Sequence, residues 1–70
     1  MAVSQSHFKT KLGEAIHSRK GRNLIMVTES GEQLIENAKL DRNQTGFSFT
    51  IDGKPFSLDF EDVVRFEVPE

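Results

Sequence analysis

The stretch from residue 46 to residue 60, GFSFTIDGKPFSLDF, constrains the fold more than any other part of the sequence. Apolar residues alternate with polar ones on both sides of an Asp-Gly pair, and a strand places alternate side chains on the same face. Asp-Gly is typical of a type I′ turn, because both central residues of that turn need a positive φ. The sequence therefore predicts a β-hairpin with one apolar face, and four of the six Phe residues lie in it.

This hairpin is the expected nucleus of the hydrophobic core, together with the apolar run near residue 66. The predicted core residues are Phe47, Phe49, Ile51, Phe56, Leu58, Phe60, Val64 and Phe66. A chain of 70 residues forms one domain, here residues 1–70, and is close to the lower size limit for a stable single core. Because the chain has no Cys to form a disulfide, oligomerisation is the remaining way to strengthen so small a domain.

Residues 5–20 have the apolar spacing of an amphipathic helix. The apolar positions are Phe8, Leu12, Ala15 and Ile16. Ser4 or Ser6 can cap the start of the helix, and Gly21 suits the position that follows its end. Gly13 costs such a helix about 1 kcal/mol relative to Ala, and we interpret it as a point of close packing on the sheet.

The remaining chain predicts five short strands between residues 23 and 68. Residues 24–28 form a nearly continuous apolar run, typical of a strand covered on both faces. In residues 33–40, Glu36 shares a face with Leu34, Ala38 and Leu40, which predicts either a bulge or a bend out of the core. Residues 41–46 form a polar connection to the hairpin, and residues 63–68 form the last strand.

These elements predict a mainly β fold, with an N-terminal α-helix at about residues 5–20 and a five-stranded antiparallel barrel at about residues 23–68. A meander of short strands with one apolar face can curl and close on itself, which removes its exposed edges. We therefore expect a small SH3-like or Sm-like barrel capped by the helix.

This order of elements resembles that of the Sm-like family, and particularly of the bacterial Hfq-like RNA chaperones. Gly31 with Leu34 resembles the family's pattern at the turn between the first two strands, and Leu40-Asp41 resembles the pair that ends the second strand. The chain departs from the family at Glu36, where a second Gly is usual, and at residues 59–62, where DFED replaces a basic, His-bearing link. The resemblance implies an RNA-binding protein that assembles into a ring, although carboxylates in the link would repel phosphate from the family's central RNA pocket.

The charge of the chain is divided between its two parts. Residues 1–22 carry a net charge of +4, whereas residues 23–70 carry −6. The cations of the first part are the predicted RNA-binding residues, and they are Lys9, Lys11, Arg19, Lys20 and Arg22. Contacts from these side chains would be made to the phosphate backbone. Two other interpretations stay open: solvated surface charges, or cations that complement the helix dipole and the acidic part of a neighbouring copy.

No residue pattern indicates catalysis, a metal or a cofactor. His7 and His17 have no partner at metal-ligand spacing, so we expect ordinary surface histidines. Asp59, Glu61 and Asp62 are typical of a solvated turn, with a weak divalent-ion site as the alternative. The sequence contains no glycine-rich phosphate loop and no nucleophile elbow. We therefore expect a non-enzymatic protein without a cofactor.

The expected partners are other copies of the chain, in a ring closed by edge strands, and single-stranded RNA. The alternative function is a protein-interaction module built on an SH3-like barrel, with a regulatory or assembly role. No apolar run approaches the roughly 20 residues of a membrane span. Since the sequence also has no Cys and no signal-peptide core, we expect a cytoplasmic location.

Overall fold

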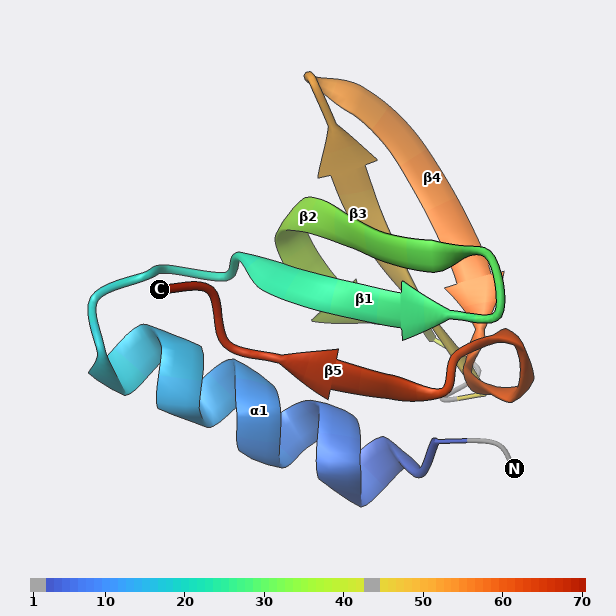
Figure 1. Cartoon of the computed structure of the whole chain (residues 1–70), viewed down its shortest axis with the longest axis horizontal. Coiled ribbons are helices and arrows are strands. Elements are labelled where there is room, and N and C mark those ends of the chain that lie inside the picture. Colours follow the sequence, from blue (N-terminus) through green and yellow to red (C-terminus); the bar gives the residue numbers. More distant parts are fainter. Residues whose placement is uncertain (1–2, 43–44) are drawn as a thin grey trace.

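The computed structural model describes residues 3–42 and 45–70, in which one helix precedes five strands (Figure 1). The elements are α1 (Gln5–His17), β1 (Leu24–Thr28), β2 (Gly31–Leu40), β3 (Gly46–Ile51), β4 (Lys54–Asp59), the short 3₁₀ helix η1 (Phe60–Asp62) and β5 (Arg65–Glu67). This order confirms the predicted helix and five strands, and it is consistent with an Sm-like topology. Of the predicted polar connection at 41–46, residues 43 and 44 lie outside the described residues.

The strands form one antiparallel sheet in the order β4-β3-β2-β1-β5. The first half of β2 pairs with β1, and its second half pairs with β3. Within residues 3–42 and 45–70 no strand pairing joins β4 to β5, so hydrogen bonds do not close the expected barrel. β5 has only three residues and pairs with β1 alone. Figure 1 shows the β3–β4 hairpin extending away from β5, while α1 lies along β5.

β2 bends at Asn37, and the bend decides which residues of this strand are buried. Asn37 has a φ of 55°, in the left-handed region that Asn adopts more readily than most residues. The pairing register with β3 shifts between Glu36 and Lys39, so the irregularity predicted at Glu36 is present, as a register shift together with a bend. On the two sides of the bend, Ile35 and Ala38 are fully buried.

The face predicted for β2 is wrong at Leu34, which is 49% exposed. Ile35 occupies the core instead, because a change of one residue in phase turns every side chain of a strand to the opposite face. Beyond the bulge the prediction is correct, since Ala38 is buried and Leu40 packs against the core. The bulge is also fixed from outside the sheet, where the Ala38 N–H donates to the Arg22 carbonyl at 2.9 Å.

The predicted hairpin is confirmed in β3 and β4. Asp52 and Gly53 have φ values of 53° and 82°, as a type I′ turn requires. The turn sets the register that pairs Ile51 with Lys54 and Phe49 with Phe56.

Aromatic rings from α1 and the sheet meet in the centre of the molecule. Phe8 of α1 contacts Phe47, Phe60 and Phe66, with ring centroids 5.5, 5.4 and 5.1 Å apart. Phe8, Phe47 and Phe66 are almost fully buried. The helix thus covers the open side of the bent sheet, where hydrogen-bonded closure is missing.

Two residues of the predicted core are exposed. Phe56 is 48% exposed because β4 is an edge strand, beyond which no strand of residues 3–42 and 45–70 lies. Val64 is 45% exposed, and Val63 is buried in its place. η1 and the bend that follows it shift the strand alternation by one position, which the sequence pattern around residues 60–66 does not reveal. Ile51 and Leu58 are partly buried and pack against the core.

The ends of α1 differ in part from the sequence prediction. Ser4 caps the start, as expected, and its Oγ accepts a hydrogen bond from the His7 N–H at 3.0 Å. The helix ends at His17, before the predicted residue 20, because Arg19 adopts a φ of 63°. The Lys20 N–H then donates to the Ala15 carbonyl at 2.8 Å, which completes a Schellman-type end. Gly21 therefore follows the helix terminus without forming it.

His7 fixes α1 against the outer edge of β5. Its Nε2 accepts a hydrogen bond from the Phe66 N–H at 3.0 Å, and its ring stacks on the Phe66 ring with centroids 6.2 Å apart. The expectation of an ordinary surface histidine is therefore wrong for His7, which is half-buried, whereas His17 is exposed.

Gly13 does not mark close packing, contrary to the sequence interpretation. A Cβ at Gly13 would meet no atom within 4 Å, whereas a Cβ at Gly46 would lie 2.5 Å from the Leu58 carbonyl oxygen. Gly46 is therefore the residue at which two backbones approach closely.

The core assignment predicts unequal effects of two Phe substitutions. Phe49→Ala should lower the free energy of unfolding by about 3–5 kcal/mol, because it empties a buried site. Phe56→Ala, its cross-strand neighbour, should cost only about 1 kcal/mol, because half of that ring is already in water. Urea titrations at low protein concentration measure both values, and equal losses would contradict the burial described above.

The two glycines should respond in opposite directions to Ala. Gly13→Ala should raise the free energy of unfolding by about 1 kcal/mol, since it removes the entropic cost of Gly in a helix without a clash. Gly46→Ala should lower it by about 1–3 kcal/mol, because the new Cβ would press on a strand backbone. Thermal melts of the two variants provide the comparison, and a stabilised Gly46→Ala would refute the close approach.

The hydrogen bond from the Phe66 N–H should require a side-chain acceptor at position 7. His7→Leu should destabilise the fold by about 1–3 kcal/mol, because the Phe66 N–H loses its partner. His7→Gln, whose side-chain oxygen can accept the same hydrogen bond, should lose less. Hydrogen exchange of the Phe66 amide gives a direct measurement, and equal exchange in the parent and His7→Leu would exclude this bond.

Candidate nucleic-acid interface

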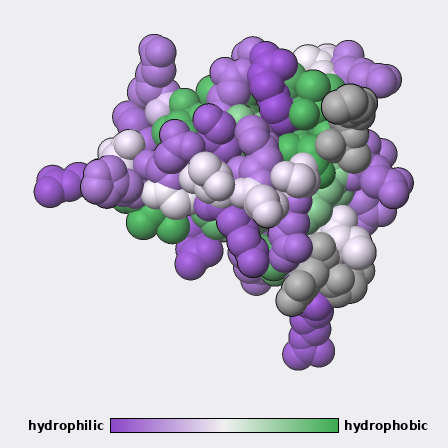
Figure 2. Space-filling view, turned by 90° about the horizontal axis from the view of Figure 1, so that it is seen from below, coloured by the Kyte–Doolittle hydropathy of each residue, from purple (hydrophilic) through white to green (hydrophobic). Residues whose placement is uncertain are grey.

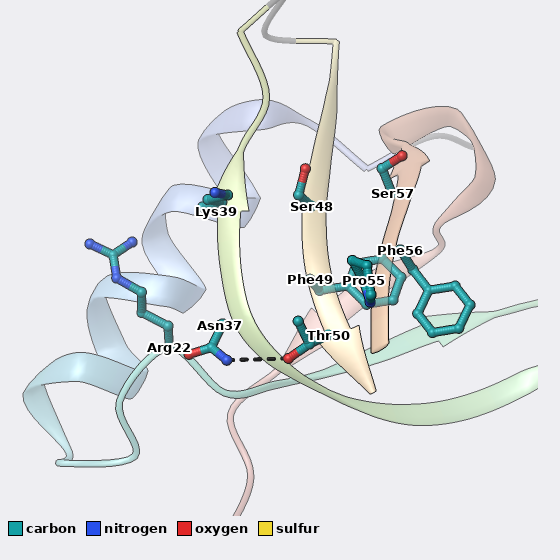
Figure 3. Close-up of a pocket in the computed structure, with 9 residues that line it drawn as sticks. All are labelled: Arg22, Asn37, Lys39, Ser48, Phe49, Thr50, Pro55, Phe56 and Ser57. Carbon is teal, nitrogen blue, oxygen red and sulfur yellow. Dashed lines mark hydrogen bonds between the residues drawn. The ribbon is translucent and has the colours of Figure 1, made fainter. Parts of the chain in front are cut away.

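An open groove of about 810 Å³ crosses the outer face of β2, β3 and β4 (Figure 3). Most of its lining residues come from these three strands, and one comes from the segment between α1 and β1. They are Arg22, Asn37, Lys39, Ser48, Phe49, Thr50, Pro55, Phe56 and Ser57. The groove exists because the bulge of β2 and the β3–β4 hairpin give the outer face of the sheet its curvature.

A row of polar side chains runs across the groove. Lys39 pairs with Ser48, and Ser48 pairs with Ser57, so the three residues lie side by side on neighbouring strands. Paired residues in a sheet share a face, and this face is opposite to the one on which Phe47 and Phe49 enter the core. The Ser48 hydroxyl also donates to the Asp41 carboxylate, at the end of β2. The row therefore offers the Lys39 ammonium group and the Ser57 hydroxyl as donors, while the Ser48 hydroxyl between them is bound to Asp41.

Asn37 contributes both backbone and side chain to the groove. Its Nδ2 donates to Thr50 Oγ1 at 3.2 Å (Figure 3). Thr50 Oγ1 in turn donates to the Glu36 carbonyl at 3.3 Å. These bonds connect the bulge of β2 to β3. The polar wall of the groove is thus held in place by hydrogen bonds between strands.

The groove carries two cations and no carboxylate among its described lining residues. Arg22 and Lys39 lie at its β2 side, 17 positions apart in the sequence. They meet there because the Arg22 carbonyl accepts the Ala38 N–H and so brings the end of the α1–β1 segment to the bulge. In a chain with 11 acidic residues, a lining with only positive charge favours an anionic ligand.

Three acidic residues, Glu29, Glu61 and Asp62, lie together on another part of the surface. A smaller groove of about 310 Å³ is lined by Thr28, Glu29, Ser30, Glu61, Asp62, Val63 and Val64. It contains Glu61 and Asp62 of the predicted acidic turn, which the structure places in η1, whereas Asp59 ends β4 and does not line this groove. In the described part of the chain, no three His, Cys, Asp or Glu residues form a group that could hold a metal ion.

The structure separates the five predicted RNA-binding residues. Arg22 lines the groove, and Arg19 and Lys20 stand shortly before it in the chain, at the end of α1. Lys9 and Lys11 lie on α1 and do not line the groove. Lys11 also pairs with Glu14, with Nζ and Oε2 3.6 Å apart. Of the five predicted RNA-binding residues, only Arg22, which follows the end of α1, therefore lines the groove.

Lys39 is the residue that sequence reasoning missed. The predicted β2 pattern already turned it outward, between Ala38 and Leu40, but nothing in the pattern indicated which residues it would face.

Seen from the side of α1, the surface is mainly hydrophilic, and apolar residues show between polar side chains (Figure 2). None of the helices in the described residues is long and apolar enough to cross a membrane.

A scan of the chain against protein-family models finds no match, and searches of curated proteins and of solved structures find none either. The similarity to Sm-like proteins consequently rests on the helix and the five antiparallel strands that follow it.

Proposed function

We propose that this protein binds single-stranded RNA, without catalysing a reaction, through the groove on β2, β3 and β4. The observation that carries the proposal is the lining itself, in which Arg22 and Lys39 are the charged residues; the Asp41 carboxylate next to it accepts the hydrogen bond of the Ser48 hydroxyl. Cations that neutralise phosphates supply most of the free energy of non-specific nucleic-acid binding. The neighbouring Ser57 hydroxyl can donate a hydrogen bond to phosphate or ribose oxygens, whereas the single O–H of Ser48 is donated to Asp41.

The contacts are made to the RNA backbone and not to the bases. Base recognition in single strands uses aromatic side chains as stacking platforms. Two rings line the groove, Phe49 and Phe56, but neither belongs to the polar row, and Phe49 is only 4% exposed. Phe56 is the most exposed aromatic ring in the described residues, but its side chain points away from the Ser57 hydroxyl (Figure 3). The groove therefore binds with little sequence preference.

The proposal includes membership of the Sm-like class of small barrels, many of which bind RNA as oligomers. The element order and the strongly bent second strand support it. In this chain Asn37, one position after Glu36, adopts the backbone conformation for which the family's second Gly would be suited. The principal departure from the family, the acidic link at η1, lies in the acidic groove and leaves the basic one unaffected.

The alternative is a protein-interaction module that pairs through a strand edge, and the unpaired outer edge of β4 favours it. The two functions differ in their response to salt. Binding through phosphates weakens steeply as salt rises, whereas backbone pairing along a strand edge does not.

Two double charge reversals of equal size test the RNA proposal. Arg22→Glu with Lys39→Glu should weaken binding of a single-stranded RNA by roughly tenfold to 100-fold at low salt, because it places carboxylates in the groove. Lys9→Glu with Lys11→Glu changes the net charge equally but leaves the groove intact, so its effect should be much smaller. Fluorescence anisotropy at several salt concentrations measures both.

The salt dependence of RNA affinity gives a second, independent measurement. Loss of two phosphate contacts should reduce the log–log slope of affinity against salt by about 1.4 for a single strand. Equal losses in both variants would assign the binding to overall charge and refute the groove. No binding by the parent protein at low salt would refute the RNA function itself, and a partner captured with salt-independent affinity would favour the interaction module.

A further inference from the structure

The two edges of the sheet are protected unequally. At β5, the Phe66 N–H is occupied by His7 and α1 packs along the strand. At β4, the other edge, no described residue pairs with the outer side of the strand, and Phe56 is 48% exposed. An unpaired strand edge with an exposed aromatic residue is a template for pairing with another chain.

The hairpin geometry decides which backbone groups of β4 are available. In a two-residue hairpin the residues that flank the turn, here Ile51 and Lys54, exchange hydrogen bonds with each other. The alternation of the strand then directs Pro55, Ser57 and Asp59 outward. Pro55 has no N–H, so an inward position would have removed a bond from the sheet. The free groups are therefore the N–H of Ser57 and of Asp59 and the carbonyls of all three residues.

We propose that β4 pairs antiparallel with β4 of a second copy of this chain, with Ser57 opposite Ser57 on a two-fold axis. In this register the two Ser57 residues exchange hydrogen bonds, and each Asp59 N–H donates to the Pro55 carbonyl of the other copy. Pro55 thereby acts only as an acceptor, and registers centred on it are excluded because they lack donors. A two-fold contact of this kind is closed and uses the same surface on both copies.

The side chains on both faces fit this register. On the core side, Phe56 lies opposite Leu58 of the second copy, so two incompletely buried apolar side chains cover each other. Cross-strand aromatic–aliphatic pairs of this kind stabilise sheets. A ring formed by β4 with β5 of the next copy would instead require the Phe66 N–H to leave His7. The structure thus favours the two-fold pairing over the ring expected from the sequence.

The pairing also extends the polar row of the groove. On the outer face, Lys39, Ser48 and Ser57 of one copy continue into Ser57, Ser48 and Lys39 of the other. With strands about 4.8 Å apart, the two Lys39 backbones lie roughly 24 Å from each other across the axis. If the proposed RNA function holds, the two grooves form one continuous track for a single strand. The dimer itself does not depend on that function.

A single cysteine tests the register, because the parent chain contains none. In Ser57→Cys the two Cα atoms would lie about 5.5 Å apart, which suits a disulfide. Oxidised glutathione should therefore link Ser57→Cys into a dimer rapidly. Ser30→Cys, in the exposed β1–β2 turn, should link slowly and only through collisions. Equal rates for the two variants would overturn the proposal.

Ser57→Pro tests the contact without any cross-link. Its ring replaces an N–H that points away from β3, so the fold should survive, as circular dichroism would show. Light scattering at millimolar concentration should report a dimer for the parent and a monomer for Ser57→Pro. A monomeric parent, or a particle larger than a dimer that persists in Ser57→Pro, would overturn the proposal.

The RNA measurements separate this inference from the proposed function. Arg22→Glu with Lys39→Glu should remain dimeric while it loses RNA, because neither side chain lies on the outer edge of β4. Ser57→Ala removes the hydroxyl but keeps the backbone N–H, so it is the control for Ser57→Pro in RNA binding. Ser57→Pro should bind a long strand several-fold more weakly than Ser57→Ala, since the two grooves no longer act together. Equal affinity of Ser57→Pro and Ser57→Ala for a long strand would contradict the joined track, and the cross-linking result would still decide the dimer.

Discussion

The bend of β2 at Asn37 is the constraint on which the rest of this structure depends. With a φ of 55°, this residue lets one strand pair with β1 in its first half and with β3 in its second. The two halves of the sheet face each other only because of that bend, and the buried Phe side chains fill the space between them. The same bend places Lys39 on the outer surface beside Arg22. Core and candidate interface are therefore two consequences of one backbone conformation.

The two edge strands of the open sheet, β5 and β4, differ in how they are covered. Hydrogen bonds do not join β4 to β5, so α1 covers the gap with Phe8 and occupies the β5 edge with His7. β4 receives no such cover, and its Pro55 removes only one of the outward donors. A domain of this size has little stability to spare, so an exposed aromatic ring on an unpaired edge is better explained by a surface that becomes covered than by one that stays in water.

Local patterns in the sequence predicted the local structure. The hairpin was predicted because strand alternation and Asp-Gly turn chemistry act within 15 neighbouring residues, and the helix start followed from a single Ser4 cap. The predicted burial is wrong where the alternation of buried and exposed residues shifts by one position. These shifts occur at the bulge before Ala38 and at η1 before Val63. At each place a shift of one residue exchanges the buried and exposed faces, and no apolar pattern records the shift. Phe56 was assigned to the core because its pattern matches that of Phe49, and only the strand order shows that β4 is an edge.

The candidate interface was predicted only in part, since it depends on long-range contacts. Arg22 belonged to the predicted cation cluster, but its partner Lys39 belongs to the acidic part of the chain and is brought near by the Ala38 backbone bond. Arg19 shows that this region is not optimised for stability alone. A Gly at its position would adopt the left-handed conformation without strain, and the chain instead has a cation there, with Gly two residues later. Of the cations that follow α1, Arg22 is the one that lines the groove, because the hydrogen bond from the Ala38 N–H to its carbonyl fixes its backbone beside the bulge.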